Sequence, residues 1–221
     1  MKIALDGPSG AGKSSLAKAI AREMHIVYVD TGALYRSIGL FVRGRGVDPK
    51  DAEAVVACLP DIKLDMVFEN GEQHIYLCGE DVGNRIRTPE ISMYASAVSA
   101  IPAVRAFLLE TQRSIARKTD VIMDGRDIGT VILPDAEVKI FLTASPEARA
   151  KRRLLELQAK GDPITYEELL AQMRERDEND STRKTAPAIP AEDAVFLDNS
   201  DLTAEETVAA ALRIILQKTE K

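Results

Sequence analysis

The chain is poor in the side chains that build metal centres: its 221 residues include two cysteines, Cys58 and Cys78, and two histidines. The cysteines lack the short spacing of a zinc site, so we expect reduced, buried thiols and no structural zinc. No apolar run reaches the length of a membrane span, and no signal peptide precedes the first strand pattern, which together predict a cytoplasmic protein. A basic excess is also lacking, because the net charge is −6, and we therefore expect neither a membrane nor a nucleic acid as partner.

Internal repeats and low-complexity linkers are absent as well. The composition, 45% hydrophobic and 29% charged, is that of one globular domain with a substantial core. Short apolar runs alternate with helical patterns, which predicts an α/β fold with a parallel sheet and helices on both of its faces. The strands are predicted at residues 3–5, 25–29, 120–124, 138–142 and 195–197.

A different pattern interrupts this alternation between residues 62 and 87. Residues 63–68 and 73–77 alternate between apolar and polar side chains, as half-buried strands do. Between them stands Asn70-Gly71, a dipeptide typical of two-residue hairpin turns. We expect a small antiparallel β insert within the α/β domain.

Residues 7–14 read Gly-Pro-Ser-Gly-Ala-Gly-Lys-Ser, a complete phosphate-binding loop between a strand pattern and a helix pattern. The glycines let the backbone turn tightly, so that N–H groups and the positive end of the following helix dipole point at an anion. Lys13 is expected to reach the β- and γ-phosphates of the nucleotide, and the Ser14 hydroxyl to bind Mg²⁺. Since an incidental glycine turn rarely has this context, the loop predicts binding of a nucleoside triphosphate.

Asp124 ends an apolar strand pattern and is followed by Gly125-Arg126-Asp127. A carboxylate at this end of a buried strand is suited to face Mg²⁺ or the nucleotide, although an Asp that caps the following turn would look the same in sequence. Many ATPases follow such an Asp with a Glu that polarises water, whereas this chain has glycine. An Asn-Lys-x-Asp motif for guanine is missing too. The residues therefore favour transfer to an acceptor other than water.

Arginines gather at predicted element ends, and guanidinium groups suit bidentate binding of phosphate. Each arginine taken singly is more often solvated, but together, beside a phosphate loop, they indicate a phosphorylated acceptor. Residues 167–176 are predicted as helix and 183–190 as loop. The arginines near element ends are Arg36, Arg105, Arg126, Arg176 and Arg183, and those on one face of a helix that Ser145-Pro146 opens are Arg149, Arg152 and Arg153.

Six motifs, in order and over essentially the whole chain, resemble those of the bacterial-type cytidylate (CMP) kinases. The phosphate loop alone is widespread, but the aspartate-centred motifs that accompany it are specific. The motifs are Gly-Pro-Ser-Gly-Ala-Gly-Lys-Ser, Asp30-Thr31-Gly32-Ala33-Leu34-Tyr35-Arg36, Gly79-Glu80-Asp81-Val82, Ile86-Arg87-Thr88, Asp124-Gly125-Arg126-Asp127-Ile128-Gly129-Thr130 and Arg176-Asp177 with Asp180 and Arg183.

This resemblance implies the P-loop nucleoside monophosphate kinase fold, with a five-stranded parallel core, a monophosphate-binding β insert and a helical lid. Residues 1–221 would form one kinase domain that acts as a monomer. Its expected parts are a core of about 1–60, 89–145 and 190–221, an insert of about 62–88 and a lid of about 146–185.

The resemblance also implies roles for single residues. Lys13, Arg126, Arg149 and Arg153 would take part in catalysis, and Ser14 would contact Mg²⁺, with Asp124 as a second candidate and Ser15 as an alternative hydroxyl. ATP, the phosphoryl donor, would be bound by Gly7, Pro8, Ser9, Gly10, Ala11, Gly12, Lys13, Ser14, Ser15 and Arg152. CMP would be bound by Thr31, by Arg36 and Arg126 at its phosphate, by Ser96, Arg105 and Asp127 at the cytosine edge, and by Arg176, Asp180 and Arg183 at the ribose.

The expected activity is ATP- and Mg²⁺-dependent phosphorylation of CMP and dCMP in pyrimidine nucleotide metabolism. One alternative is a kinase of the same fold that acts on another small phosphorylated acceptor or on a hydroxyl acceptor. Another is a nucleotide-binding switch without transfer activity, which would hydrolyse ATP slowly and ignore nucleoside monophosphates.

Overall fold

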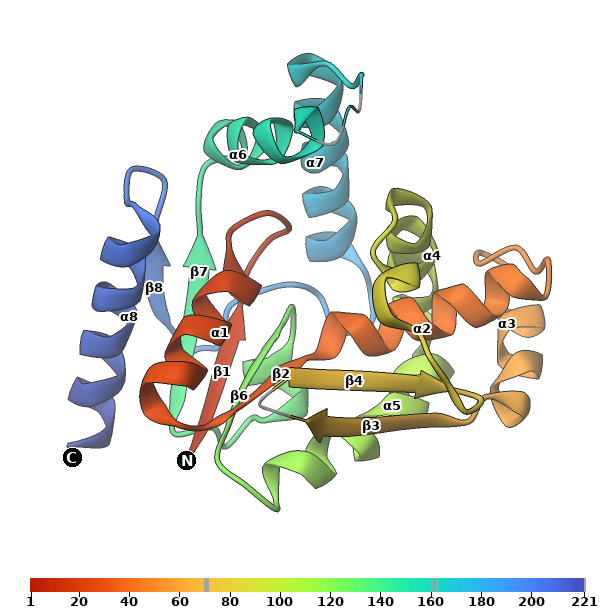
Figure 1. Ribbon diagram of the computed structural model, residues 1–221, viewed down its shortest axis with the longest axis horizontal. Coiled ribbons are helices and arrows are strands. Elements are labelled where there is room, and N and C mark those ends of the chain that lie inside the picture. The colour runs from red at the N-terminus through yellow and green to blue at the C-terminus, as the bar shows by residue number, and fades with distance from the viewer. Residues whose placement is uncertain (70–71, 160, 162, 221) are drawn as a thin grey trace. The chain divides into compact units, whose positions relative to one another are not determined.

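The computed structural model describes residues 1–69, 72–159, 161 and 163–220. The chain forms two compact units, which we describe separately. Unit 1 consists of Met1–Ile26 and Ile122–Lys221, and unit 2 consists of Val27–Val121. Figure 1 shows their helices and strands.

The predicted α/β fold is confirmed, with a five-stranded sheet in the order β2-β6-β1-β7-β8. In unit 1 the parallel register places Ile3 opposite Val138 and Ile140 opposite Val195. Ile3 and Ile140 are almost fully buried, which explains why these strands look like continuous apolar runs. The strands are β1 (Lys2–Asp6), β2 (Val27–Asp30), β6 (Val121–Gly125), β7 (Val138–Thr143) and β8 (Val195–Asp198).

The described residues of unit 1 also form four α-helices. α6 and α7 pack on each other through a small apolar cluster that includes Ala150, Leu169 and Met173, while α8 runs beside β8 (Figure 1). The predicted cap of α6 is confirmed, because the Ser145 hydroxyl accepts from the N–H of Ala148. The helices are α1 (Lys13–Met24), α6 (Pro146–Gln158), α7 (Tyr166–Thr182) and α8 (Ala204–Thr219), and a short π-helical turn, η3, spans Ile128–Ile132.

In its described part, unit 2 combines four α-helices with the antiparallel insert. α2 and α4 pack closely at Gly39, where a Cβ atom would lie 3.0 Å from the Cβ of Tyr94. The insert is confirmed as a three-stranded antiparallel sheet, β3-β4-β5, although Asn70 and Gly71 themselves lie outside the described residues. The elements are α2 (Thr31–Gly44), α3 (Ala52–Cys58), η1 (Leu59–Asp61), β3 (Leu64–Glu69), β4 (Glu72–Leu77), β5 (Glu80–Asp81), η2 (Gly83–Ile86), α4 (Pro89–Ser99) and α5 (Pro102–Ala116).

Three local predictions are wrong. His25 does not begin a strand but ends α1 with a φ of 55°, a left-handed conformation. α7 does not end at Arg176 but continues to Thr182. Cys58 and Cys78 are free thiols, as expected, but they are not buried, because the first is half-exposed at the end of α3 and the second is exposed after β4.

Among the described helices, none is by itself long and apolar enough to cross a membrane. α4 and α5 meet that criterion only when taken together, as a pair bent by 99°.

Candidate active site

The phosphate loop runs from the end of β1 to the start of α1. At Gly7 (φ 149°) a side chain has no room, because a Cβ atom would lie 1.9 Å from the carbonyl oxygen of Leu142. Gly12 precedes α1 with a φ of 92° and gives the helix no side-chain cap. The first N–H groups of α1 are therefore left for another acceptor, which is the arrangement that binds phosphate at a helix N-terminus.

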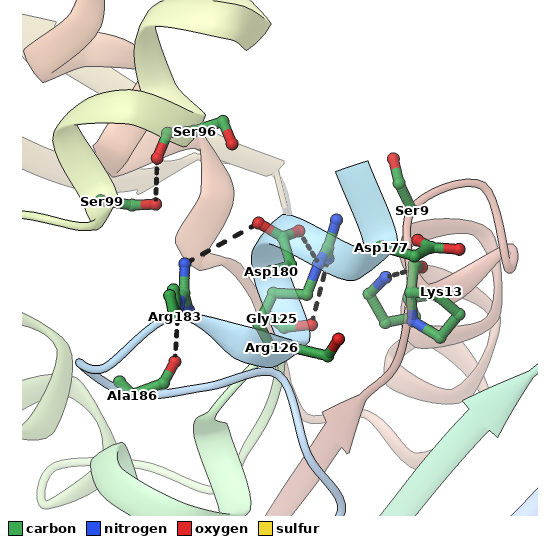
Figure 2. Close-up of polar contacts among 12 residues, drawn as sticks. Ser9, Lys13, Ser96, Ser99, Gly125, Arg126, Asp177, Asp180, Arg183 and Ala186 are labelled. Carbon is green, nitrogen blue, oxygen red and sulfur yellow. Dashed lines mark hydrogen bonds and ion pairs between the residues drawn. The ribbon is translucent and has the colours of Figure 1, made fainter. Parts of the chain in front are cut away.

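Lys13 is the first residue of α1, and its side chain is buried against the loop. Its Nζ donates a 2.7 Å hydrogen bond to the carbonyl oxygen of Pro8 (Figure 2). Burial, reinforced by the positive charge of Arg126, lowers the pKa of Lys13 well below its usual value, while Asp124 and Asp6 act in the opposite direction. An anionic ligand at this position would stabilise the charged amine.

Ser14 and Asp124 meet directly, since Ser14 Oγ donates a 2.7 Å hydrogen bond to Asp124 Oδ2. Asp124 is buried in β6, and Ser14 is exposed at the start of α1. A hydroxyl and a carboxylate are hard oxygen ligands, the type that Mg²⁺ prefers. The pair therefore fits a magnesium ion bound between the loop and β6, and it places the hydroxyl of Ser14 beside the second candidate ligand.

Asp6 is a buried carboxyl group that the sequence prediction missed. Its two oxygens accept hydrogen bonds of 2.8 Å from the N–H groups of Ile128 and Gly129, at the start of η3. Burial raises the pKa of Asp6 to about 6, and the nearby Asp127 adds to this shift. The sequence carried a signal, because Asp6 ends a strand pattern as Asp124 does. Asp6 ties the phosphate loop to the segment that follows Arg126 and Asp127.

Unit 1 brings two of its predicted acceptor residues, Arg126 and Arg183, to the carboxylate of a third, Asp180. Asp180 Oδ2 lies 3.2 Å from Arg126 Nε, and Oδ1 lies 3.9 Å from Arg183 Nη1 (Figure 2). Arg183 is further fixed by a 2.7 Å hydrogen bond from its Nε to the carbonyl oxygen of Ala186. Because a guanidinium held at one edge keeps its other N–H groups oriented, both arginines are suited to an anionic ligand.

Two other predicted residues of unit 1 lie close to this network in sequence. Asp127 is buried and is followed by the π-helical turn η3, a type of turn that is frequent at functional sites. Arg176 lies on α7 one turn before Asp180 and is close enough to Lys13 to lower its pKa.

In unit 2, the side chain of Asp30 fixes the guanidinium of Arg36. One oxygen of Asp30 accepts from the N–H of Ala33 and caps α2, and the other accepts a 2.7 Å hydrogen bond from Arg36 Nη2. Within the described part of the chain, the buried Nε of Arg36 has no hydrogen-bond partner. A buried N–H without an acceptor is costly, so Arg36 is suited to a ligand that supplies one. Thr31, the first residue of α2, is also buried.

The remaining predicted acceptor residues of unit 2 lie on α4 and α5. Arg105 is buried, donates to the carbonyl oxygen of Ser99 at 3.2 Å, and lies 5.4 Å from the ring centre of Tyr35. Ser96 accepts a 2.8 Å hydrogen bond from Ser99 through its carbonyl oxygen (Figure 2).

The three arginines of α6 make different contacts. Arg149 is almost fully buried and bridges the loop to α7, since it donates to the carbonyl oxygen of Ser9 at 2.9 Å and pairs with Asp177 at 2.6 Å. Arg153 is half-buried and pairs with Glu156 on its own helix. Arg152 Nη1 donates to Asn199 Oδ1 at 3.2 Å.

Asn199 is a second residue that the sequence prediction missed. While its Oδ1 binds Arg152, its Nδ2 donates to the carbonyl oxygen of Ala11 at 3.1 Å. It thus connects the phosphate loop to α6. Nothing in the sequence indicated this role, since Asn199 and Ala11 are 188 residues apart.

Comparison with known proteins gives one consistent result. The family model "Cytidylate kinase" matches residues 3–217. A cytidylate kinase of Caldicellulosiruptor bescii is 47% identical, covering 97% of this chain and 95% of its own. The cytidylate kinase of Fervidobacterium nodosum is 48% identical and covers 98% of this chain and 97% of its own. The cytidylate kinase of Caldanaerobacter subterraneus subsp. tengcongensis is 49% identical and covers 100% of this chain and 96% of its own.

Solved structures resemble the fold at low sequence identity. A shikimate kinase from Bacteroides thetaiotaomicron has a TM-score of 0.51 at 15% identity, covering 100% of this chain and 99% of its own. A gluconokinase from Sinorhizobium meliloti 1021 has a TM-score of 0.50 at 16% identity, covering 99% and 93%. At these identities the likeness shows the P-loop kinase fold alone.

Proposed function

The chain belongs to the cytidylate kinase family, and on that premise we propose that it transfers the γ-phosphoryl group of ATP to CMP, giving ADP and CDP. We extend the proposal to dCMP as acceptor, to Mg²⁺ as cofactor, and to a monomer working in the cytoplasm. The whole chain would act as one kinase domain, with the core, the insert at about 62–88 and the lid at about 146–185 expected from its sequence.

The buried, unpartnered Nε of Arg36 is the observation that carries this function best among the described residues. A planar guanidinium that is fixed by Asp30 on one side and keeps an unused N–H group on another fits a phosphate oxygen. Arg126 is a second guanidinium that a carboxylate, that of Asp180, holds in place. An acceptor that carries its own phosphate uses both, whereas a simple hydroxyl acceptor has no need of either.

The donor phosphates would bind to residues 7–15. Backbone N–H groups, the N-terminus of α1 and Lys13 would share the charge that develops on the γ-phosphoryl group, where positioned cations contribute most to catalysis. Ser14 and Asp124 would hold a magnesium ion, whose charge, when it is bound, would offset that of the β- and γ-phosphates. Arg149 and Arg153 would add positive charge from the lid, and Arg152 would contact ATP.

The acceptor needs no general base. The second pKa of a phosphate monoester is about 6, so the attacking oxygen of CMP is largely ionised at neutral pH. Arg36 and Arg126 would hold the phosphate that carries this oxygen. Thr31 would contact the same nucleotide, Arg176, Asp180 and Arg183 would hold the ribose side, and Ser96, Arg105 and Asp127 would face the cytosine edge. Closure of the lid would exclude water and suppress hydrolysis of ATP.

ADP formation measured with and without CMP tests this proposal. Wild-type protein should form ADP at a rate that depends on CMP, and Lys13→Ala should abolish the reaction while the fold remains intact. Lys18→Ala, an exposed lysine on the same helix, is the matched control and should retain activity. Slow ADP formation that no nucleoside monophosphate stimulates would identify a nucleotide-binding switch instead.

A further inference from the structure

We propose that Gln73, on β4 of the insert, is a positioning residue that holds Arg36 in place for the acceptor phosphate by fixing the backbone of Asp30. The role presupposes the proposed function, in which Arg36 binds the phosphate of CMP. All three residues belong to unit 2, where β4 lies beside the end of β2 (Figure 1).

The side-chain amide of Gln73 binds both backbone groups of one residue. Its Oε1 accepts a 2.7 Å hydrogen bond from the N–H of Asp30, and its Nε2 donates at 3.2 Å to the carbonyl oxygen of Asp30. A neighbouring strand would satisfy a strand residue in the same way. The amide of Gln73 thus extends the ordered backbone of β2 to its last residue, across 43 positions of sequence.

Asp30, whose backbone Gln73 fixes, in turn holds the side chain of Arg36. Its carboxylate caps α2 at the N–H of Ala33 and binds Arg36 Nη2, both within 2.9 Å. Gly32 leaves room for this pair, because an added Cβ atom there would lie 3.0 Å from Arg36 Nη1 and 3.2 Å from Asp30 Oδ1. A rotation of the Asp30 backbone would therefore move the guanidinium, since the carboxylate is bonded to both Ala33 and Arg36.

Glutamine is suited to this position because its amide both accepts and donates a hydrogen bond. It carries an acceptor oxygen and a donor amide at the end of a side chain long enough to reach Asp30, while glutamate has no donor and methionine has no donor and only a weak acceptor. Asparagine carries the same groups on a chain shorter by one methylene.

The insert does not depend on Gln73 for its attachment. Ile75, on the same strand, is 3% exposed in the main apolar cluster of unit 2, and Met66 and Leu77 pack against that cluster. Apolar burial of this kind holds the insert to the unit. The two hydrogen bonds of Gln73 are therefore not needed to attach the insert, and their effect is to fix the backbone of Asp30.

Kinetic constants of Gln73→Met test the proposal. We expect the KM for CMP to rise about five- to tenfold, as the loss of one such pair of hydrogen bonds does, with the KM for ATP within about twofold of wild type. Gln73→Asn should raise the KM for CMP in the same way, which keeps the test decisive if the methionine variant folds poorly. His74→Asn is the matched control, because His74 lies next to Gln73 on β4 but binds Asp81 within the insert. It should leave both KM values unchanged.

A double-mutant cycle separates positioning from general stability. In an Arg36→Met background, Gln73→Met should raise the KM for CMP no further, because the residue through which it acts is gone. A rise of the same size in both backgrounds, or a drop in thermal stability with unchanged KM values, would overturn the role of Gln73. If Arg36→Met itself leaves the KM for CMP unchanged, the proposed function of Arg36 fails instead.

Discussion

Ser14 Oγ and Asp124 Oδ2 are joined by a 2.7 Å hydrogen bond, although the two residues are 110 positions apart in the chain. The bond links the start of α1 to β6, so the phosphate loop, which is proposed to bind ATP, is connected to the strand that leads to Arg126. It also distinguishes the two serines that the sequence leaves equivalent as magnesium ligands. Ser14, paired with a buried carboxylate, is the better candidate.

Ser14→Ala should therefore raise the magnesium concentration needed for half-maximal activity and lower kcat by at least about tenfold, because the ion loses a ligand. Ser15→Ala, the adjacent hydroxyl, should leave the magnesium requirement close to that of wild type. Titration of activity with MgCl₂ at saturating ATP and CMP measures both. A larger loss in the Ser15 variant would assign the metal contact to Ser15.

Asp180→Ala should weaken the binding of CMP more than that of dCMP. The Asp180 carboxylate is proposed to lie at the ribose hydroxyls, and these distinguish CMP from dCMP. Both acceptors should lose some affinity, since Asp180 also orients Arg126 at 3.2 Å. Steady-state constants for both nucleotides measure the difference, and Glu175→Ala, an exposed residue of the same helix, is the control. Equal losses for CMP and dCMP would reduce Asp180 to a partner of Arg126 and Arg183.

Asp127→Asn should narrow the preference for CMP over UMP more than it lowers turnover at saturating CMP. A carboxylate accepts from the exocyclic amine of cytosine, whereas uracil presents a carbonyl oxygen there and leaves two acceptors facing each other. An unpaired buried polar group costs about 1–3 kcal/mol, enough for a preference of tenfold or more. A collapse of turnover with an unchanged CMP/UMP ratio would place Asp127 in the chemistry or at the metal.

Asp6 should make the free energy of unfolding depend on pH in a defined direction. Burial raises its pKa from 3.8 to about 6, so as the pH falls the folded protein takes up this proton before the unfolded chain does. The stabilising contribution of the protonated group is fully present below pH 3.8 and is lost as the pH rises through about 6. A shift of this size corresponds to about 3 kcal/mol.

Asp6→Asn cannot titrate and removes this dependence. The free energy of unfolding of wild type minus that of Asp6→Asn should therefore increase by up to about 3 kcal/mol between pH 7 and pH 4. Urea denaturation at four pH values measures it, with the exposed Asp201→Asn as control. A difference that stays constant with pH would contradict a raised pKa at Asp6.

The features that the sequence predicted well are those determined by neighbouring residues. The phosphate loop needs glycines at fixed positions between a strand and a helix, and the strands of the core are apolar because both of their faces are buried. The cap of α6 could likewise be predicted, because Ser145 and its partner Ala148 lie within four residues of sequence.

The features that it missed depend on distant partners. The last turns of α7, after Arg176, contain poor helix formers such as Asn and Ser, yet they are helical where Asp177 pairs with Arg149 and Asp180 with Arg126. His25 ends α1 in a left-handed conformation, which is uncommon for residues other than glycine, whereas the apolar residues after it favoured a strand. Gln73 and Asn199 gain their roles only from contacts across 43 and 188 positions.

ADP production by the purified protein with ATP and each of CMP, dCMP, UMP, AMP and GMP measures which nucleotide this chain phosphorylates. We expect kcat/KM to be highest for CMP, with dCMP also phosphorylated, UMP at least about tenfold lower, and the purine nucleotides at the rate without acceptor. A preference for AMP, GMP or UMP, or equal rates with all five nucleotides, would contradict the assignment of this chain as a kinase for CMP.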